Sequence, residues 1–409
     1  MKQYESYKES GIEWIGRIPS HWICAPFKHY MQINNGRDYK HVVSEVGYPV
    51  IGSGGQFACA SEYLYDGEAL LLGRKGTIDR PIYINAKFWT VDTMFYAIPS
   101  SEVSCKYMYY QSLGFPFGLY ATDTALPSMT QTALGENPIC VPPLIEQQSI
   151  VSYLDDKVCQ IEAVISGKKA MVEDLQNYRK SIITEIVTQG LNPDAPMKDS
   201  GIDWMGTIPE HWRIAKTSYL FEEIGSGTTP NTNNEKYYVE DGINWLQTGD
   251  LNDGYIEKTT KHISSKALEE NSALRVYPKG SLVIAMYGAT IGKVGILNIE
   301  TTTNQACCVL ANSKSLLGKY AYYAFIASKQ SLVNLAFGGG QPNISQAIIR
   351  SHKLPVPPLE EQQAIVSYLD SKMQGFDFTI SELQTQIEDL KSYKASLITE
   401  AVTGKIDLR

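Results

Sequence analysis

The stretch "VPPLIEQQSIVSYLD" at residues 141–155 returns as "VPPLEEQQAIVSYLD" at residues 356–370, with thirteen of fifteen positions identical. The likeness continues downstream, from "NYRKSIITEIVTQG" (177–190) to "SYKASLITEAVTGK" (392–405). Two prolines in each copy end the preceding segment and suit the first turn of a helix. Glu146, Glu360 and Glu361 then fall in that first turn, where the helix dipole favours acidic side chains. Each copy therefore predicts the start of a helix.

Both helices are predicted to be long and to pair with each other. Residues 145–188 contain no proline and only one glycine, and apolar residues recur at steps of three and four, which is typical of a coiled-coil seam. The predicted seam consists of Leu154, Ile161, Ile165, Val172, Leu175, Ile182, Leu369, Phe376, Ile380, Leu383, Ile387, Leu390 and Leu397. Lys168, Arg179 and Lys394 interrupt it and can fix the register. About 44 residues span about 65 Å as a helix, so we expect an antiparallel pair. The alternative is that the helices belong to separate compact domains.

A second, shorter repeat precedes each divergent part of the chain. Residues 7–22 read "YKESGIEWIGRIPSHW" and residues 197–212 read "MKDSGIDWMGTIPEHW", with ten of sixteen positions identical. The offset is 190 for this motif and 215 for the helical one, so the second copy carries 25 extra residues in its middle. His21 and His211 occupy equivalent positions beside tryptophans, and we expect them to serve packing. The chain is thus a duplicated frame with two different inserts.

The inserts read as globular α/β domains. Short β-branched and aromatic runs alternate with glycine turns, as in "ALLLGRKGTIDRPIYI" and "GSLVIAMYGATIGKVGIL". Residues 317–337 read as a helix, with a shorter counterpart at 105–115. The predicted fold class is α+β, with two globular α/β domains separated by two long antiparallel coiled-coil helices in a pseudo-two-fold repeat. The predicted divisions are the motif 1–22, the insert 23–140, the helix 141–190, the second motif 191–212, the insert 213–355 and the helix 356–409.

Composition and charge narrow the class of protein. The chain has 409 residues, 43% hydrophobic and 20% charged, which suffices for packed cores. No apolar run approaches a membrane span, no secretory leader is visible at the start, and seven scattered cysteines favour a reducing, cytoplasmic setting. The formal net charge of −8 argues against a simple basic nucleic-acid binder. The acidity lies mainly on the frame, since the second insert is slightly basic.

Motifs that carry catalysis are missing. "GATIGKVG" (288–295) resembles a phosphate-binding loop, but it is one residue short and has Val294 where Ser or Thr should bind magnesium. A hairpin with turns at Gly288 and Gly292 is the better interpretation. No (D/N/S)-P-P-(Y/F/W), G-x-G-x-x-G, H-E-x-x-H or G-x-S-x-G sequence is present. The sequence therefore predicts no catalytic residue, no metal site and no cofactor in this chain.

These residues resemble a known family. The paired motifs "SGIEWIGRIPSHW" and "SGIDWMGTIPEHW", and the paired "VPPL" helices, are similar to those of the specificity (S, HsdS) subunit of type I restriction-modification systems. Residues 225–251 resemble the start of one kind of target recognition domain, and residues 70–98 resemble the middle of another. The resemblance covers nearly the whole chain.

The resemblance implies a non-catalytic, sequence-specific DNA-binding subunit. Each target recognition domain would read one half of a bipartite, asymmetric site in double-stranded DNA, and the helices would set the gap. The helices would also dock two methyltransferase subunits (HsdM), which use S-adenosylmethionine. Two restriction subunits (HsdR), which use ATP and magnesium, would join the complex in systems that cleave DNA.

Candidate DNA-binding residues lie beside glycine-rich turns of the inserts. Arg and Lys suit guanine, and Asn and Gln suit adenine. The candidates are Arg37, Lys40, Arg74, Lys75, Thr77 and Arg80 in the first insert, and Thr228, Thr229, Asn231, Asn234, Lys236, Lys293, Gln305, Gln341 and Asn343 in the second. For each residue the alternative is ordinary loop polarity. Arg74 and Lys75 are the preferred pair, because "GRKG" presents two cations from one turn.

Three other functions stay open at this point. The first is the specificity part of a related system in which one fused enzyme methylates and cuts. The second is a coiled-coil adaptor that binds no DNA, although it would not require two divergent inserts. The third is a self-sufficient nuclease or transferase, which the missing motifs disfavour.

Overall fold

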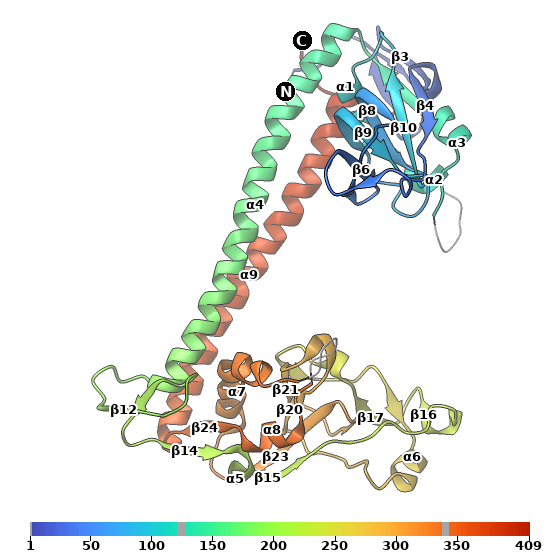
Figure 1. Ribbon diagram of the computed structural model, residues 1–409. Coiled ribbons are helices and arrows are strands. Elements are labelled where there is room, and N and C mark those ends of the chain that lie inside the picture. Colours follow the sequence, from blue (N-terminus) through green and yellow to red (C-terminus); the bar gives the residue numbers. More distant parts are fainter. Residues whose placement is uncertain (1, 121–126, 338–342) are drawn as a thin grey trace. The chain divides into compact units, whose positions relative to one another are not determined.

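The computed structural model divides the chain into two compact units (Figure 1). The structure describes residues 2–120, 127–337 and 343–409. The first unit comprises Met1–Ala170 and Leu383–Arg409, and the second comprises Met171–Glu382. Two long helices, α4 (Leu144–Gln189) and α9 (Leu359–Val402), each contribute one segment to both units. None of the helices in the described ranges is long and apolar enough to cross a membrane.

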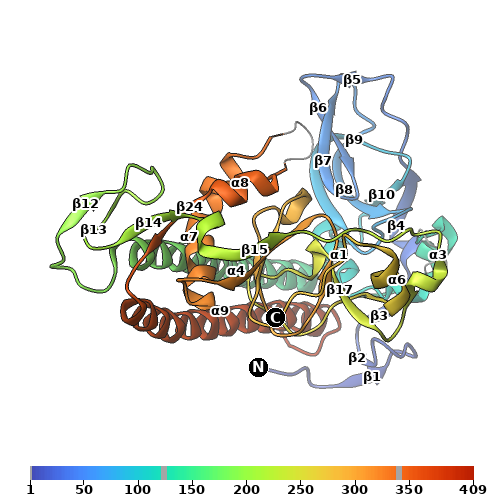
Figure 2. The ribbon, with the colours of Figure 1, turned by 90° about the horizontal axis from the view of Figure 1, so that it is seen from below.

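The first unit is built on a seven-stranded sheet with the order β4-β10-β8-β9-β6-β7-β5, seen in blue in Figure 2. Its strands are β4 (Met31–Asn35), β5 (Val43–Ser44), β6 (Tyr48–Gly52), β7 (Gly55–Ala60), β8 (Tyr65–Gly73), β9 (Ile82–Thr90) and β10 (Met94–Pro99). Residues 69–73 at the end of β8 are all buried, because this strand lies between two neighbours and is covered on both faces.

Short elements surround this sheet. They are β1 (Tyr7–Glu9) paired with β2 (Arg17–Pro19), β3 (Ile23–Pro26) paired with β11 (Pro138–Val141), and the helices η1 (Phe27–His29), α1 (Cys105–Ser112), α2 (Phe117–Tyr120) and α3 (Gln131–Glu136). The core extends from the sheet and α1 to the long helices, with Trp22, Tyr107 and Leu154 fully buried.

The second unit contains two sheets. A five-stranded sheet has the order β15-β23-β20-β21-β18, and a four-stranded sheet has the order β16-β19-β17-β22. Their strands are β15 (Phe221–Gly225), β16 (Tyr238–Val239), β17 (Ile243–Leu246), β18 (Tyr255–Ile256), β19 (His262–Ile263), β20 (Leu282–Ala285), β21 (Val294–Leu297), β22 (Thr302–Thr303) and β23 (Cys307–Ser313). Strands β20 and β21 form the predicted hairpin, in which Gly288 begins a short 3₁₀ helix and Gly292 lies in the following turn, both with positive φ.

Several of the other elements of the second unit have counterparts in the first. They are β12 (Met197–Asp199) paired with β13 (Thr207–Pro209), β14 (Arg213–Lys216) paired with β24 (Lys353–Val356), the α-helices α5 (Thr217–Leu220), α6 (Ser265–Glu270), α7 (Gly318–Asn334) and α8 (Gln346–Ser351), and the 3₁₀ helices η2 (Glu235–Tyr237), η3 (Thr248–Asp250) and η4 (Gly288–Thr290). Helix α7 packs on the five-stranded sheet, with Tyr320 and Phe325 fully buried.

Within each unit the segments of α4 and α9 pack against each other, which confirms the predicted fold class. In the first unit Lys168 Nζ donates to Gln386 Oε1 (2.6 Å) and Lys394 Nζ donates to Glu162 Oε1 (3.1 Å). Residue numbers rise along one helix as they fall along the other, so the segments are antiparallel. In the second unit Arg179 pairs with Asp377 (2.8 Å). The three basic residues that interrupt the apolar seam therefore all have polar partners on the facing helix.

Most of the predicted seam is buried, but it shifts by one residue near the end of α4. Leu154, Ile161, Ile165, Leu369, Ile380, Leu383, Ile387 and Leu397 are buried, and Val172, Leu175, Ile182, Phe376 and Leu390 are half-buried. Ile183 and Val187, which the prediction omitted, are nearly inaccessible. The reason is that the end of α4 also faces the second short motif, where Trp212 lies against Gly190.

The acidic residue in the first turn of each long helix binds the short motif. Glu146 accepts hydrogen bonds from Trp22 Nε1 (3.0 Å) and Tyr4 Oη (3.1 Å), and its other oxygen lies 2.7 Å from His21 Nε2. In the second unit Glu361 accepts from Trp212 Nε1 (2.9 Å) and lies 2.6 Å from His211. These contacts give the duplicated histidines and tryptophans their packing role.

The residue that follows in each helix is a buried glutamine that binds the insert. Gln147 Oε1 accepts from Ser104 N (2.8 Å) at the start of α1, and Gln147 Nε2 donates to Glu102 O (3.1 Å). Gln362 makes the same pair of contacts, with Leu317 N (2.8 Å) and Ser315 O (2.9 Å) at the start of α7. Helices α1 and α7 are therefore counterparts, as predicted from the sequence.

His352 is buried in the second unit between two aromatic rings. It stacks on Trp204 and on Phe325, with centroid distances of 6.0 Å to each. Burial lowers the pKa of its imidazole from 6.5 to about 4, because the charged form loses its hydration. Asn137 occupies the position of His352 in the first copy, at the offset of 215.

We expect Glu146→Gln to lower the free energy of unfolding by about 1–3 kcal/mol, because a neutral amide replaces the carboxylate that accepts from Trp22 and Tyr4 and faces His21. Glu361→Gln should cost less, since Glu361 is more exposed and binds two partners rather than three. Urea unfolding followed by tryptophan fluorescence measures both. Glu360→Gln is the control, because it removes a charge from the same helix turn. If Glu360→Gln lowers the free energy of unfolding as much as Glu361→Gln does, the effect comes from the helix dipole and not from the hydrogen bonds.

The buried imidazole predicts a pH dependence of stability. The folded-state pKa lies below the unfolded value, so its contribution is complete above about pH 6.5 and falls as the pH drops toward 4. Between pH 6.5 and 4.5 the wild type should lose on the order of 2 kcal/mol more than His352→Asn. Denaturant unfolding at several pH values measures this difference. Parallel pH profiles of the two proteins would contradict it.

Candidate nucleic-acid interface

Loops that are distant in sequence meet at one end of the first unit's sheet. The backbone N of Arg37 donates to Thr90 O (2.9 Å), and the backbone N atoms of Arg74 and Lys75 donate to Thr93 O (2.8 and 3.2 Å). Lys75 also forms an isolated β-bridge with Ser128. We call this region the first junction, which comprises residues 36–38, 74–75, 90–93 and 127–129.

The path of the first junction is fixed by a close backbone approach. A Cβ atom on Gly36 would lie 2.0 Å from Val91 O, so only glycine fits there. The carbonyl of Arg37 accepts a hydrogen bond from Trp89 Nε1 (3.0 Å). The loop after β4 is therefore held on both sides, and the side chains that follow Gly36 are presented from a rigid base.

The exposed side chains of the first junction are charged. Arg37, Asp38, Lys75 and Asp92 are all exposed, and within the described residues none of them takes part in an ion pair. Arg74 differs, because it is half-buried with its guanidinium over the Phe95 ring (5.8 Å). The preferred pair of the sequence prediction therefore contributes one free cation, Lys75, rather than two.

A hollow of about 760 Å³ lies beside the first junction. Its lining combines the acidic side chains Asp38 and Asp92 with Lys40, Thr93 and the aromatic ring of Phe57. Phe57 is 55% exposed and stands at right angles to the Tyr39 ring, with centroids 5.2 Å apart. Charged and aromatic side chains of the junction and of the hollow therefore lie next to each other on the surface.

The second unit repeats the junction with other side chains. Gly227 N donates to Thr303 Oγ1 (3.0 Å), and a Cβ atom on Gly227 would lie 1.8 Å from Thr303 O. Trp245 Nε1 donates to Thr228 O (3.2 Å), as Trp89 does to the carbonyl of Arg37. We call this region the second junction, which comprises residues 226–229, 286–287, 303–306 and 343–344.

The residues just before α3 and α8 make equivalent backbone contacts with the two junctions. Met129 N donates to Arg74 O (2.9 Å), and Ile344 N donates to Met286 O (2.9 Å). The bridge between Lys75 and Ser128 corresponds to the one between Tyr287 and Asn343. Arg74 thus corresponds to Met286, and Lys75 corresponds to Tyr287.

The second junction is uncharged. Thr229 Oγ1 donates to Gln305 Oε1 (2.7 Å), which orients the exposed amide of Gln305. Tyr287 is 38% exposed and Met286 is buried. This junction therefore offers amide and hydroxyl groups where the first junction offers ions.

The structure brings only some of the predicted DNA-binding residues together. Those in or beside the junctions are Arg37, Lys40, Arg74 and Lys75 in the first unit, and Thr228, Thr229, Gln305 and Asn343 in the second. Thr77 and Arg80 are exposed farther along the loop after β8. Asn231 and Asn234 lie in the turn that leads to η2, and Lys236 lies within η2. Lys293 is turned away, since its Nζ donates to Leu251 O (3.2 Å). Gln341 lies outside the described residues.

Sequence reasoning missed Asp38, Asp92 and Tyr287. The sequence prediction was limited to cationic, amide and hydroxyl residues near glycine turns. Asp38, Asp92 and Tyr287 come to lie beside those residues only through strand pairing. One signal was present in the sequence. Ser128 and Asn343 are related by the same offset of 215 as the helical repeat. The alignment of the two "VPPL" repeats could therefore have been extended toward the N-terminus, into the last part of both inserts.

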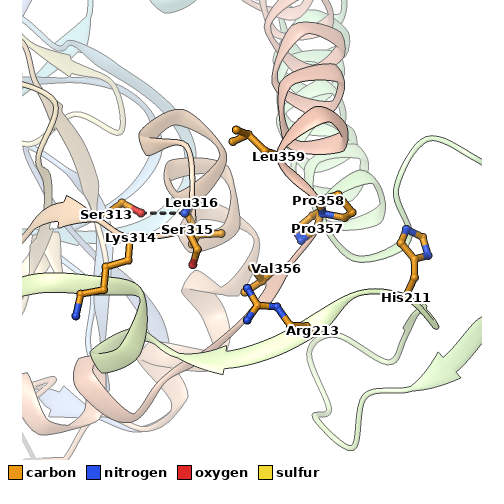
Figure 3. A pocket seen from close by; sticks show the side chains of 10 residues that line it. All are labelled: His211, Arg213, Ser313, Lys314, Ser315, Leu316, Val356, Pro357, Pro358 and Leu359. Carbon is orange, nitrogen blue, oxygen red and sulfur yellow. Dashed lines mark hydrogen bonds between the residues drawn. The ribbon is translucent and has the colours of Figure 1, made fainter.

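A further hollow of about 530 Å³ lies in the second unit where α9 begins (Figure 3). Pro357, Pro358 and Leu359 of the "VPPL" repeat line it, together with Arg213 and Lys314. Leu316 N donates to Ser313 Oγ (3.0 Å) at its edge. Half of its lining residues belong to the duplicated frame and half to the second insert, so the hollow lies where the two meet.

Within the described ranges no group of three or more His, Cys, Asp or Glu side chains is placed to hold a metal ion. The seven cysteines are free thiols. What the two junctions offer is a set of hydrogen-bond donors, acceptors and charges on a rigid backbone. The chain thus presents two chemically unlike junctions on a duplicated frame.

Comparison with known proteins identifies the family. Residues 27–173 and 209–389 match the family described as type I restriction modification DNA specificity domain. The MjaIX specificity subunit of Methanocaldococcus jannaschii is 30% identical over 198 residues, which cover 47% of this chain and 44% of that protein. The MjaVIII specificity subunit of the same organism is 25% identical over 365 residues, which cover 85% and 79% of the two chains.

A solved structure agrees with this assignment at the level of fold. A chain from a structure of a type I restriction-modification system matches with a TM-score of 0.73 and 17% identity, over 95% of this chain and 99% of that one. The chain therefore belongs to the type I restriction-modification DNA specificity family. It is a DNA specificity subunit, the non-catalytic component of a type I enzyme.

Proposed function

We propose that the two inserts, residues 23–140 and 213–355, are target recognition domains that each read one half of a bipartite, asymmetric site in double-stranded DNA. The observation that carries this proposal is the pair of junctions. At Gly36 and at Gly227 a neighbouring carbonyl oxygen lies where a Cβ atom would be, which supports a similar backbone path. The four exposed charged residues of the first junction correspond to uncharged residues in the second. Two readers of one design and different chemistry suit two unlike half-sites.

The long helices would set the gap between the half-sites and dock two methyltransferase subunits (HsdM). Large apolar side chains are exposed on both helices, and such residues mark surfaces that a partner covers. They include Val164, Met171 and Tyr178 on α4, and Phe378 and Tyr393 on α9. Phe378 is 70% exposed, and Tyr178 is 59% exposed although the edge of its ring also contacts Phe376 of α9, with centroids 5.7 Å apart.

The catalytic groups of the complex would belong to its partners. The methyltransferase subunits would hold S-adenosylmethionine, and two restriction subunits (HsdR), where the system has them, would hold ATP and magnesium. This division agrees with the net charge of −8, because partner subunits can supply the phosphate contacts that an acidic chain cannot.

A methylome comparison tests this proposal. Cells carrying this gene with its methyltransferase partner should contain N6-methyladenine in a split motif, with two unlike specified halves around a fixed gap. The motif should disappear when the gene is deleted. Exchanging residues 213–355 for the recognition domain of another specificity subunit should change one half and leave the other half and the gap unchanged.

Gel shifts of the purified complex on that split site provide the control. Binding should require both halves and should fail when either half is scrambled. A chain that assembles with its partner but binds all duplexes equally would contradict the assignment as a specificity subunit. Methylation activity of this chain without its partner would contradict the division of labour.

A further inference from the structure

The two junctions differ in one chemical respect that bears on which bases they read. At corresponding positions the first has Arg37, Asp38, Lys75 and Asp92, and all four side chains are charged and exposed. The second has Thr228, Thr229, Tyr287 and Gln305 at those positions. The correspondence rests on shared hydrogen bonds and strand register rather than on sequence similarity.

We propose that the first junction reads a G·C pair and that the second reads an A·T pair, at the base pair that each junction faces. This inference rests on the proposed function and adds the identity of the bases. Arg37 would donate to guanine O6 and N7, and Gln305 would bind adenine N6 and N7. These are the pairings that major-groove geometry favours for a guanidinium and for a side-chain amide.

Arg37 is placed for a base rather than for a phosphate. Its backbone is held at both ends, by Thr90 O and by Trp89 Nε1, while its side chain is exposed and has no ion-pair partner among the described residues. Asp38 and Asp92 stand beside it on the rim of the hollow. Two carboxylates repel a phosphate backbone, but a carboxylate accepts a hydrogen bond from cytosine N4. A junction of mixed charge therefore suits the two edges of a G·C pair.

Gln305 is placed for adenine by its neighbour. The hydroxyl of Thr229 donates to Gln305 Oε1 (2.7 Å), which fixes the amide plane and uses one lone pair of that oxygen. The second lone pair and the amide N–H groups stay available for adenine N6 and N7. The exposed Tyr287 ring adds an apolar surface to the same junction. Nothing charged in this junction would select guanine.

The experiment uses the complex of this chain with its methyltransferase partner. Methylomes are compared for the wild type, Arg37→Gln, Gln305→Ala and Lys87→Gln. Arg37→Gln should relax the preference at one G·C position by about tenfold or more, in one half-site only. Gln305→Ala should relax one A·T position in the other half. Lys87→Gln changes an exposed cation on β9 outside the junction, and it should leave both halves unchanged.

Base analogues test the same contacts without altering the protein. Replacing the implicated guanine with 7-deazaguanine removes N7, and it should weaken wild-type binding about tenfold while scarcely affecting Arg37→Gln. The corresponding 7-deazaadenine should do the same for Gln305 in the other half. Thr229→Val should reproduce part of the Gln305→Ala effect, because Thr229 positions the amide. These measurements keep the proposal testable if a variant fails to fold.

Three results would overturn the proposal. The first is a motif whose halves are both unchanged in Arg37→Gln and Gln305→Ala. The second is relaxation at bases of the opposite kind. The third is a uniform loss of methylation in Arg37→Gln with an intact motif, which is the behaviour of a phosphate contact. The absence of any gene-dependent split motif in the wild type would instead contradict the proposed function.

Discussion

Two buried glutamines determine how each insert is attached to the frame. Gln147 and Gln362 are almost inaccessible, and each uses its amide oxygen and nitrogen to bind the backbone just before α1 or α7. A buried amide without partners costs free energy, so the insert must dock where these backbone groups meet the glutamine. The preceding glutamate binds the short motif in the same helix turn. One turn of helix thus joins motif, insert and long helix in each unit.

Another contact between insert and long helix is duplicated as well, and it lies away from the junctions. Tyr110 and Tyr323 donate to Asp155 and Asp370 at 2.6 Å. The pKa of both tyrosines is raised, mainly by burial and to a smaller extent by the hydrogen bond to the carboxylate. The hydroxyl groups therefore stay protonated and act as donors. Because attachment is settled by these residues, loops at the other end of each insert can change without disturbing it. This separation permits specificity to diverge on a constant frame.

The sequence could predict the frame because its burial is periodic and its duplication is visible. From the sequence, Glu146 was expected only to interact with the helix dipole. Nothing in the local sequence indicates that Trp22, 124 residues earlier, donates a hydrogen bond to it. The heptad pattern predicted Ile182 rather than Ile183 as a seam residue, because it takes account only of the facing helix. The second short motif also packs against this end of α4. The junctions were harder still, since Arg37, Lys75 and Asp92 meet only through antiparallel pairing of β4, β10 and β8. Non-local strand register is not contained in composition or local spacing.

Gly36 and Gly227 connect the constant frame to the variable function. At both positions a neighbouring carbonyl oxygen occupies the space of a Cβ atom, so the two loops follow similar backbone paths. If loop position is the same in both domains, a difference in target cannot come from where the loop lies. It must come from the side chains that the loop presents, and these are ionic in one unit and amide or hydroxyl in the other. If the inserts read the two half-sites as proposed, a duplicated fold distinguishes them by changing a few exposed side chains.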